Sequence, residues 1–437
     1  MKINFNTHQP NFKSNLTFDI GGSQREGSCK IYYATTEKDE PIFTENTTVN
    51  NLGKNKFVDG DDFISLLIAK IKRIQKATEQ IIKNRKYPEK ENLLKNLAIF
   101  LPSYTSNNRA FYLPNYRNFE NKALKDVDFT NLKEKLVENG IKIAPDMQFK
   151  ILQDALGTGL AMTKKLYEND MLKEGRYYTA CITGGGCGIS NIEVVDKDKV
   201  VIKSSGSSCL SQSLALQKVS KAGASAPALI ENFCKAMGFN DEIIEDIKAC
   251  QKAEFTLNET VDYPKNVKTE KLKKKLLETK HFIVTYEDDE TFTLKVKDEH
   301  KEKFDTARRN AIDKYCLALA RLAIIKKNEG SNGMIVTGTV AKAVNKAGEE
   351  NYGCGVGQWV MQHLAQSFNS FELDKMQDTY QFEVMCDERF FIDNNTECRE
   401  FVHLAEPISA DRGNWLKLDM KNLKPSNQGF EEPPIFC

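Results

Sequence analysis

Glycine turns at the ends of apolar, β-rich segments constrain the fold and function of this chain more than any other feature. Because glycine has no Cβ, the backbone amides of such a turn approach phosphate oxygens closely and form an anion-binding nest. A single glycine turn is usually an ordinary hairpin, so the number and order of the turns carry the argument. The turns are Gly21-Gly22-Ser23, Gly184-Gly185-Gly186-Cys187-Gly188 and Gly338-Thr339.

The first two turns each lie between an apolar strand and a return strand, and each such unit opens a mixed α/β stretch. This weak internal symmetry predicts two related lobes with a cleft between them. The segments predicted as strands are residues 16–20, 29–34, 97–101, 177–183, 189–195 and 334–338, and the main predicted helices are residues 61–86, 128–139, 151–167 and 304–327.

We expect an N-terminal lobe over residues 16–168 and a C-terminal lobe over residues 169–425, between flexible tails at 1–15 and 426–437. Residues 241–300 are interpreted as an insertion in the C-terminal lobe, with a lysine-rich helix followed by a hairpin. Glutamates interrupt the lysine run, which favours a solvated helix face over an interaction patch.

Composition excludes several classes of protein. The 437 residues carry 62 Lys+Arg against 61 Asp+Glu, so the net charge of +1 does not favour nucleic acid or an anionic membrane as a partner. No apolar run reaches the roughly 20 residues of a membrane helix, and the polar N-terminus lacks the apolar segment of a secretion signal. The 11 cysteines include no Cys-x-x-Cys pair, which predicts reduced thiols in a cytoplasmic protein.

Neither the P-loop nor the Gly-x-Gly-x-x-Gly dinucleotide motif is present. In combination, however, the glycine turns resemble the motifs of the superfamily of sugar kinases, heat-shock chaperone ATPases and actin (ASKHA), and of its ROK/glucokinase branch. Asp19-Ile-Gly-Gly-Ser23 resembles the first phosphate motif, Asp-x-Gly-Gly-Thr. Residues 182–188 resemble the second, usually Gly-Thr-Gly-x-Gly, with Gly185 where threonine is usual. Residues 334–341 resemble the adenosine motif.

Between the two phosphate motifs, Gln153-Asp154-Ala155 resembles the Asn-Asp-Ala segment that carries the catalytic aspartate of the family. Residues 97–102 and Leu113-Pro-Asn-Tyr116 resemble the segments that precede it. The order and spacing of all these segments match the family from Asp19 to Val344, and this agreement is more specific than any one motif.

The resemblance implies an α/β, two-lobed actin-like (ribonuclease H-like) fold, in which duplicated mixed-sheet domains surround a nucleotide cleft. It implies ATP and Mg²⁺ as cofactors, with Asp19 holding Mg²⁺ through water and Asp154 accepting the proton of a substrate hydroxyl. The other residues so implied are Gly21, Gly22, Ser23, Gly184, Gly185, Gly186 and Gly188 for phosphate, Gly338 and Thr339 for adenosine, and Gln153, Asn107 and Asn115 for substrate.

The sugar half of the motif set departs from the family pattern. ROK proteins usually carry a Glu-x-Gly-His sugar clamp and a cysteine-rich zinc loop after the second phosphate hairpin. Residues 204–212 contain neither Glu nor His, and the zinc cysteines are missing, so no zinc is expected. No helix-turn-helix precedes Asp19, which disfavours a DNA-binding repressor.

Two functions therefore stay open, a kinase for a sugar-like small molecule and a catalytically inactive nucleotide- or sugar-binding protein with a sensing or scaffolding role. Retention of Asp19 and Asp154 favours the kinase, while the missing clamp favours the second function. A third reading, a superfamily member that acts on a carboxylate, has no motif in its support. Asp154 has a simpler interpretation as an N-terminal helix carboxylate, and Asn107 and Asn115 as turn residues. The sequence leaves the sugar itself and homodimer formation undecided.

Overall fold

The computed structural model describes residues 16–21, 29–34, 41–47, 56–87, 89–196, 199–206, 213–250, 253–367, 382–391, 405–407 and 415–419. The predicted tails at 1–15 and 426–437 lie outside the described residues, as do Gly22 and Ser23. The chain forms two compact units. The N-terminal unit comprises Met1–Arg176, Ser190–Cys209 and Ile392–Cys437, and the C-terminal unit comprises Tyr177–Ile189 and Leu210–Phe391.

The core of the N-terminal unit is a five-stranded sheet with the order β3-β2-β1-β5-β9. Strands β1, β2 and β3 form an antiparallel meander, whereas β1, β5 and β9 run parallel. Every residue of β1 is buried, including the polar Thr17 and Asp19 that alternate with its apolar residues. The strands are β1 (Leu16–Ile20), β2 (Cys29–Ala34), β3 (Pro41–Thr47), β5 (Leu94–Leu101) and β9 (Ile143–Gln153).

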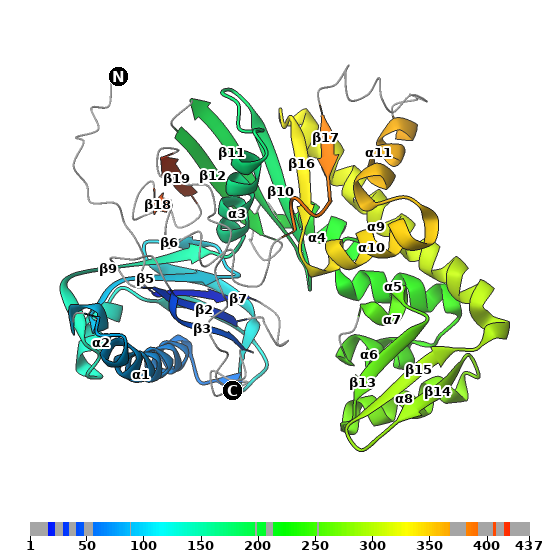
Figure 1. Ribbon diagram of the computed structural model, residues 1–437, viewed down its shortest axis with the longest axis horizontal. Coiled ribbons are helices and arrows are strands. Elements are labelled where there is room, and N and C mark those ends of the chain that lie inside the picture. The colour runs from blue at the N-terminus through cyan, green and yellow to red at the C-terminus, as the bar shows by residue number, and fades with distance from the viewer. Residues whose placement is uncertain are drawn as a thin grey trace. The chain divides into compact units, whose positions relative to one another are not determined.

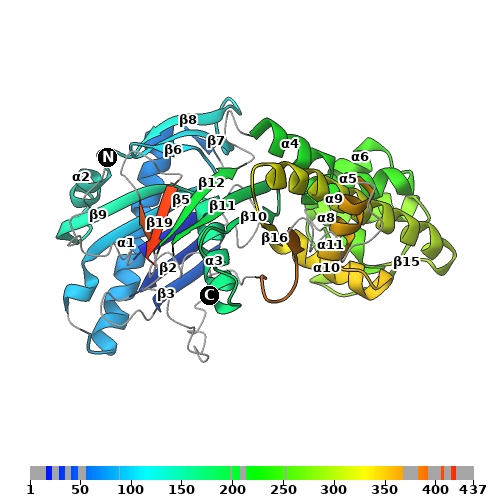
Figure 2. The same ribbon diagram turned by 90° about the horizontal axis from the view of Figure 1, so that it is seen from above.

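Helix α1 (Gly60–Asn84) lies along this sheet, as Figures 1 and 2 show from two directions. The Asp59 side chain caps its N-terminus by accepting a hydrogen bond from the Asp62 amide. Its buried apolar residues recur at helical spacing and join the core cluster formed by β1, β2 and β5. The helix predicted over residues 61–86 therefore buries the apolar face that its sequence pattern indicates.

A second, smaller sheet of the N-terminal unit joins β4 (Lys56–Phe57), β7 (Arg109–Asn118) and β6 (Thr105–Ser106), with β8 (Ala123–Asp128) paired to β7. Helix α2 (Leu132–Glu138) follows it, and helix α3 (Ala155–Glu168) follows β9. A Cβ on Gly159 of α3 would lie 2.6 Å from Ile202 Cγ2 and 2.7 Å from Ser190 Cβ. The absence of a side chain therefore lets α3 pack closely on β11 and β12.

The other large sheet has seven strands in the order β17-β16-β10-β11-β12-β19-β18, and the boundary between the units falls within β11. Five of its strands lie in the order β12-β11-β10-β16-β17. When the strands are numbered along the chain, this is the order 3-2-1-4-5, which is also the order in the N-terminal sheet. This repeated order is that of the ribonuclease H-like fold, so the predicted α/β class with duplicated mixed sheets is confirmed. The strands are β10 (Tyr177–Thr183), β11 (Cys187–Asp196), β12 (Lys199–Gly206), β16 (Gly333–Thr337), β17 (Glu383–Met385), β18 (Ala405–Pro407) and β19 (Trp415–Asp419).

Helices of the C-terminal unit pack into one large apolar core. None of the helices that the structure describes is long and apolar enough to span a lipid bilayer. The helices of the C-terminal unit are α4 (Ser213–Ala222), α5 (Ala226–Met237), α6 (Asp241–Cys250), α7 (Glu254–Leu257), α8 (Val267–Glu278), α9 (Lys301–Asn328), α10 (Thr339–Tyr352) and α11 (Val356–Ser367).

The segment interpreted as an insertion builds a three-stranded sheet of its own, in the order β13-β15-β14. Strand β13 (Thr260–Pro264) and the predicted hairpin, β14 (Phe282–Glu287) with β15 (Thr291–Val296), are antiparallel neighbours. Lysines of α8 form ion pairs with nearby carboxylates, including Lys275 with Glu242 and Asp246. Local pairing thus neutralises part of the lysine run.

Two predicted helix boundaries are wrong. The helix predicted over residues 151–167 begins only at Ala155, because Ile151 and Leu152 belong to the buried end of β9. A short apolar run fits a buried strand as well as a helix, and strand pairing with β5 decided between them. The helix predicted over residues 128–139 is the shorter α2, since β8 extends through Asp128.

Candidate functional site

The carboxyl ends of three parallel strands bring the predicted first phosphate turn and the predicted catalytic segment to the same edge of the N-terminal sheet. Asp19 of β1 is in register with Phe100 of β5, and the next residue, Leu101, is in register with Gln153 of β9. Gly21 and Asp154 follow directly after β1 and β9. This is the edge at which open α/β sheets place their ligands.

Tyr116 of β7 also reaches this edge, and the sequence motifs assign it no role in the site. Its hydroxyl donates a hydrogen bond to the Gly21 carbonyl oxygen at 2.8 Å. Burial raises the pKa of Tyr116 well above its usual value, and the nearby Asp19 and Asp154 carboxylates add to the effect. The charges of both carboxylates therefore act on one buried phenol.

Packing fixes the Tyr116 ring. Phe63 of α1 meets it edge-on with ring centroids 5.2 Å apart, and Phe57 lies 6.3 Å from it. The apolar face of α1 thus holds the ring whose hydroxyl bonds Gly21.

Asp19 is 8% exposed, and Lys30 of the neighbouring strand holds its Oδ2 at 3.1 Å. Burial, reinforced by the Asp19 charge, raises the pKa of the Cys29 thiol to about 12. A buried carboxylate of this kind suits Mg²⁺, which usually takes one or two carboxylates and fills its remaining positions with water and phosphate oxygens. Among the residues that the structure describes, no three His, Cys, Asp or Glu side chains are grouped so that they could hold a metal ion.

Asp154 is the N-terminal capping residue of α3. Its Oδ1 accepts a hydrogen bond from the Ala155 amide at 2.8 Å, and its own amide donates to the Leu101 carbonyl oxygen at 2.9 Å. The side chain is only partly buried, so the capping carboxylate is also accessible from solvent. Capping and proton transfer are therefore compatible at this residue.

The second glycine turn lies between β10 and β11 in the C-terminal unit. The Gly184 amide donates to the Gly186 carbonyl oxygen, and the Gly184 carbonyl oxygen accepts from the Ala226 amide. A Cβ added at Gly184 or Gly185 would meet no atom within 4 Å, and neither residue has a left-handed φ. Neither packing nor backbone conformation therefore requires glycine at these two positions.

Buried contacts anchor the two ends of this turn. Thr183 and Tyr315 of α9 share a hydrogen bond of 2.8 Å between their hydroxyls. The sulfur atoms of Cys181 and Cys187 lie 3.4 Å apart, and both thiols are buried. The exposed tip of the turn is thus carried on a fixed base.

Gly338 brings the predicted adenosine motif beside this turn, because β10 and β16 are parallel neighbours. It has a φ of 101° and a Cβ there would lie 2.5 Å from the Thr183 carbonyl oxygen. Helix α10 begins at the next residue, Thr339, so its N-terminal amides lie at the same edge of the sheet.

We expect Gly338→Ala to destabilise the protein by at least about 2 kcal/mol, since it combines left-handed strain with a backbone clash. The melting temperature should fall by about 4 °C or more. Gly330→Ala is the matched control, because Gly330 has a φ of 93° and no atom within 4 Å of its added Cβ. Equal losses in the two variants would contradict the close approach of Gly338 to Thr183.

The predicted substrate residues differ in their surroundings. Gln153 is fully buried, and its Oε1 accepts a hydrogen bond of 2.5 Å from Ser204 of β12, which favours a structural role. Asn107 has a φ of 50° and lies with Asn108 in the two-residue turn between β6 and β7, where asparagine is favoured. Asn115 lies on β7 next to Tyr116, and its side chain is outside the described part of the structure.

No protein-family model matches the sequence, and no curated protein matches it. Solved structures do resemble the chain. A ROK family glucokinase from Streptomyces griseus is 10% identical with a TM-score of 0.42, over 89% of this chain and 98% of that one. A glucokinase from Balamuthia mandrillaris is 12% identical with a TM-score of 0.45, over 89% and 93%. A ROK family transcriptional regulator, a homolog of the E. coli MLC protein, is 12% identical with a TM-score of 0.47, over 90% and 78%.

These solved structures include both glucokinases and a regulator. The repeated strand order, and not these similarities, identifies the fold.

Proposed function

We propose that the protein is an ATP-dependent kinase that transfers the γ-phosphoryl group to a hydroxyl of a sugar or sugar-like small molecule. The observation that carries the proposal is that Asp19, Gly21 and Asp154 lie at the carboxyl ends of parallel strands of one sheet, where the Tyr116 hydroxyl bonds Gly21. A phosphotransferase needs such groups, one to hold a metal–phosphate complex and one to accept a proton.

In this proposal Asp154 accepts the proton of the substrate hydroxyl while the hydroxyl oxygen attacks the γ-phosphorus and ADP leaves. Backbone amides near Gly21 and in the turn of residues 184–188 hold the phosphates, and residues near Gly338 and Thr339 hold the adenosine. Magnesium, held by Asp19 through water, would supply charge neutralisation at the phosphates. The proposal requires both sets of residues to act on one ATP molecule.

A catalytically inactive nucleotide- or sugar-binding protein is the second candidate, and the Asp19–Lys30 ion pair favours it. The lysine ammonium already balances the carboxylate that the kinase needs for its metal. The missing Glu and His of the family sugar clamp point the same way.

An assay of ADP formation with Mg–ATP and a panel of neutral sugars and amino sugars tests the proposal. We expect turnover that depends on one member of the panel. Thermal stabilisation by ATP or a sugar without any substrate-dependent turnover would instead support the inactive binding protein, because a ligand stabilises the state that it binds.

Asp19→Asn should raise the Mg²⁺ concentration needed for half-maximal turnover by about 10-fold or more, since it removes the charge that attracts the cation. The measurement is a magnesium titration at fixed ATP. Lys30→Met is the comparison, because it removes the competing ammonium and keeps the carboxylate, and it should not raise the magnesium requirement. An unchanged requirement in Asp19→Asn would mean that Asp19 serves only its ion pair.

A further inference from the structure

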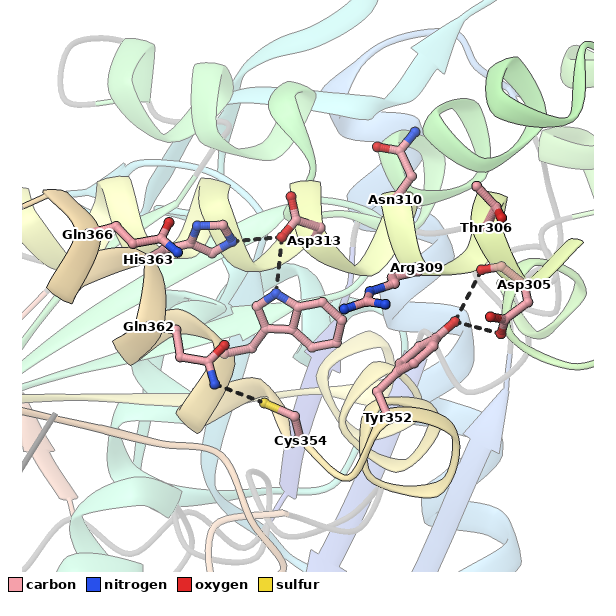
Figure 3. A pocket seen from close by; sticks show the side chains of 11 residues that line it. Asp305, Thr306, Arg309, Asn310, Asp313, Tyr352, Cys354, Gln362, His363 and Gln366 are labelled. Atoms are coloured by element: carbon pink, nitrogen blue, oxygen red, sulfur yellow. Dashed lines mark hydrogen bonds and ion pairs between the residues drawn. The ribbon is translucent and has the colours of Figure 1, made fainter. Parts of the chain in front are cut away.

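A polar pocket of about 690 Å³ lies within the C-terminal unit, away from the glycine turn. Its volume is in the range that holds small organic ligands. Helix α9 supplies one wall, helix α11 supplies the other, and the end of α10 with the α10–α11 link closes it (Figure 3). The residues lining it that bear on its chemistry are Asp305, Arg309, Asn310, Asp313, Tyr352, Trp359 and His363.

Helical periodicity separates this pocket from the proposed nucleotide site. Tyr315 of α9 bonds Thr183 at the base of the glycine turn, whereas Asp313 lines the pocket. Two residues along a helix correspond to about 200° of rotation, so the two side chains leave α9 on nearly opposite faces. The pocket therefore belongs to the face of α9 that is turned away from the glycine turn.

Asp313 organises the wall between the two helices. Its Oδ1 accepts a hydrogen bond from Trp359 Nε1 at 3.1 Å and pairs with His363 Nε2 at 3.0 Å. The His363 interaction is drawn in Figure 3. Both partners come from α11, and Trp359 is largely buried, so the indole and imidazole rings are held in place.

The opposite end of the pocket has the same combination of a carboxylate and an aromatic ring. The Tyr352 hydroxyl donates to Asp305 Oδ1 at 2.9 Å, and the Arg309 guanidinium lies 5.6 Å from the centre of the Tyr352 ring. The Tyr352 and Trp359 rings meet edge-on with centroids 5.7 Å apart. An aromatic wall thus runs between two carboxylates.

This distribution of charge selects among ligand classes. An anion such as a phosphate would be repelled by Asp313, and at the other end it would meet Asp305, whose charge Arg308 already balances. A cation would find the face of Tyr352 already taken by Arg309. A hydroxyl group both donates and accepts hydrogen bonds, which suits a lining in which carboxylates accept, Arg309 donates and Asn310 does both.

We propose that the pocket between α9 and α11 is a second small-molecule site, which binds a neutral polyhydroxylated ligand of the sugar or polyol class. The hydroxyls of such a ligand bond Asp313, Asn310 and Arg309, which line the pocket. This site is separate from the proposed kinase site and does not depend on the kinase activity.

The test uses the full chain with Trp415→Phe, because the chain has 2 tryptophans and Trp359 then becomes the only fluorescent indole. Glucose, sucrose and sorbitol are titrated while Trp359 emission is followed, with inorganic phosphate and spermidine as charged comparators. We expect a saturable change with at least one of the neutral compounds. No saturable change with any of them, or tighter binding of phosphate or spermidine, would overturn the proposal.

Two variants locate the bound compound. Asp313→Asn should weaken its binding by about 10-fold, and Asn310→Ala, which disturbs no contact of the Asp313 cluster, by about 3-fold or more. Glu302→Gln removes a carboxylate from the same helix outside the pocket and should leave binding unchanged. Binding that persists in Asp313→Asn and Asn310→Ala but is lost in Asp154→Asn would place the sugar at the proposed kinase site and refute a second site. Turnover without pocket binding would likewise refute the second site and leave the kinase proposal standing.

Discussion

Asp154→Asn should lower the turnover of Mg–ATP with the accepted sugar by about 10²–10⁴-fold, while the affinity for ATP stays nearly unchanged. Asparagine has the size of aspartate and can still accept the hydrogen bond from the Ala155 amide, so the start of α3 should be preserved. What the variant loses is the capacity to take a proton from the substrate hydroxyl. Steady-state kinetics of ADP formation, with calorimetry of ATP binding, measures both quantities.

Asp59→Asn is the matched control for this variant. Asp59 caps α1 through the Asp62 amide, three residues on, and Asp154 caps α3 through the amide of the next residue, Ala155. The two substitutions therefore make the same chemical change at two helix N-termini, and only one of them lies at the carboxyl edge of the sheet. If both variants keep wild-type turnover, Asp154 is only a helix cap and the proposed mechanism fails.

The fold could be predicted from the resemblance of the ordered motifs to a known superfamily, and the elements that carry these motifs have strong local signals. Apolar strands that run into glycine turns, and a long helix with apolar residues at helical spacing, are visible without any tertiary contact. The boundary at Ile151–Gln153 was not predictable in this way. Those residues form a strand because β5 pairs with them, and that pairing joins segments about fifty residues apart in sequence.

The candidate site shows the same division between local and tertiary information. Asp19 and Asp154 were found because each stands within a short motif. Tyr116 stands in the segment Leu113-Pro-Asn-Tyr116, but that resemblance assigns it no role in the site, and its importance comes from a hydrogen bond to Gly21, 95 residues away. The pocket of α9 and α11 was missed for a similar reason, since Asp313, Trp359 and His363 meet only when the two helices pack.

Gly184→Val should raise the dissociation constant of ATP by about 10–100-fold and leave the stability of the protein nearly unchanged. The structure has open space at the added Cβ and an ordinary backbone conformation at this position, so the fold itself tolerates a side chain. The same side chain should weaken phosphate binding, because it blocks the approach of a phosphate to the backbone amides of the turn. Loss of one or two hydrogen bonds to a charged ligand accounts for an effect of this size.

Adenosine and Gly185→Thr complete this experiment. Adenosine has no phosphates, so its affinity, measured by calorimetry, should be the same in Gly184→Val and the wild type. Gly185→Thr adds a branched side chain to the same open turn and introduces the residue that is usual there in the resembling motif, so it should keep ATP affinity within about 3-fold of the wild type. Equal losses of ATP and adenosine in Gly184→Val would indicate general damage to the C-terminal unit. Unchanged ATP binding in that variant would mean that the turn is an ordinary hairpin, because nothing in the fold then distinguishes glycine from valine at this position.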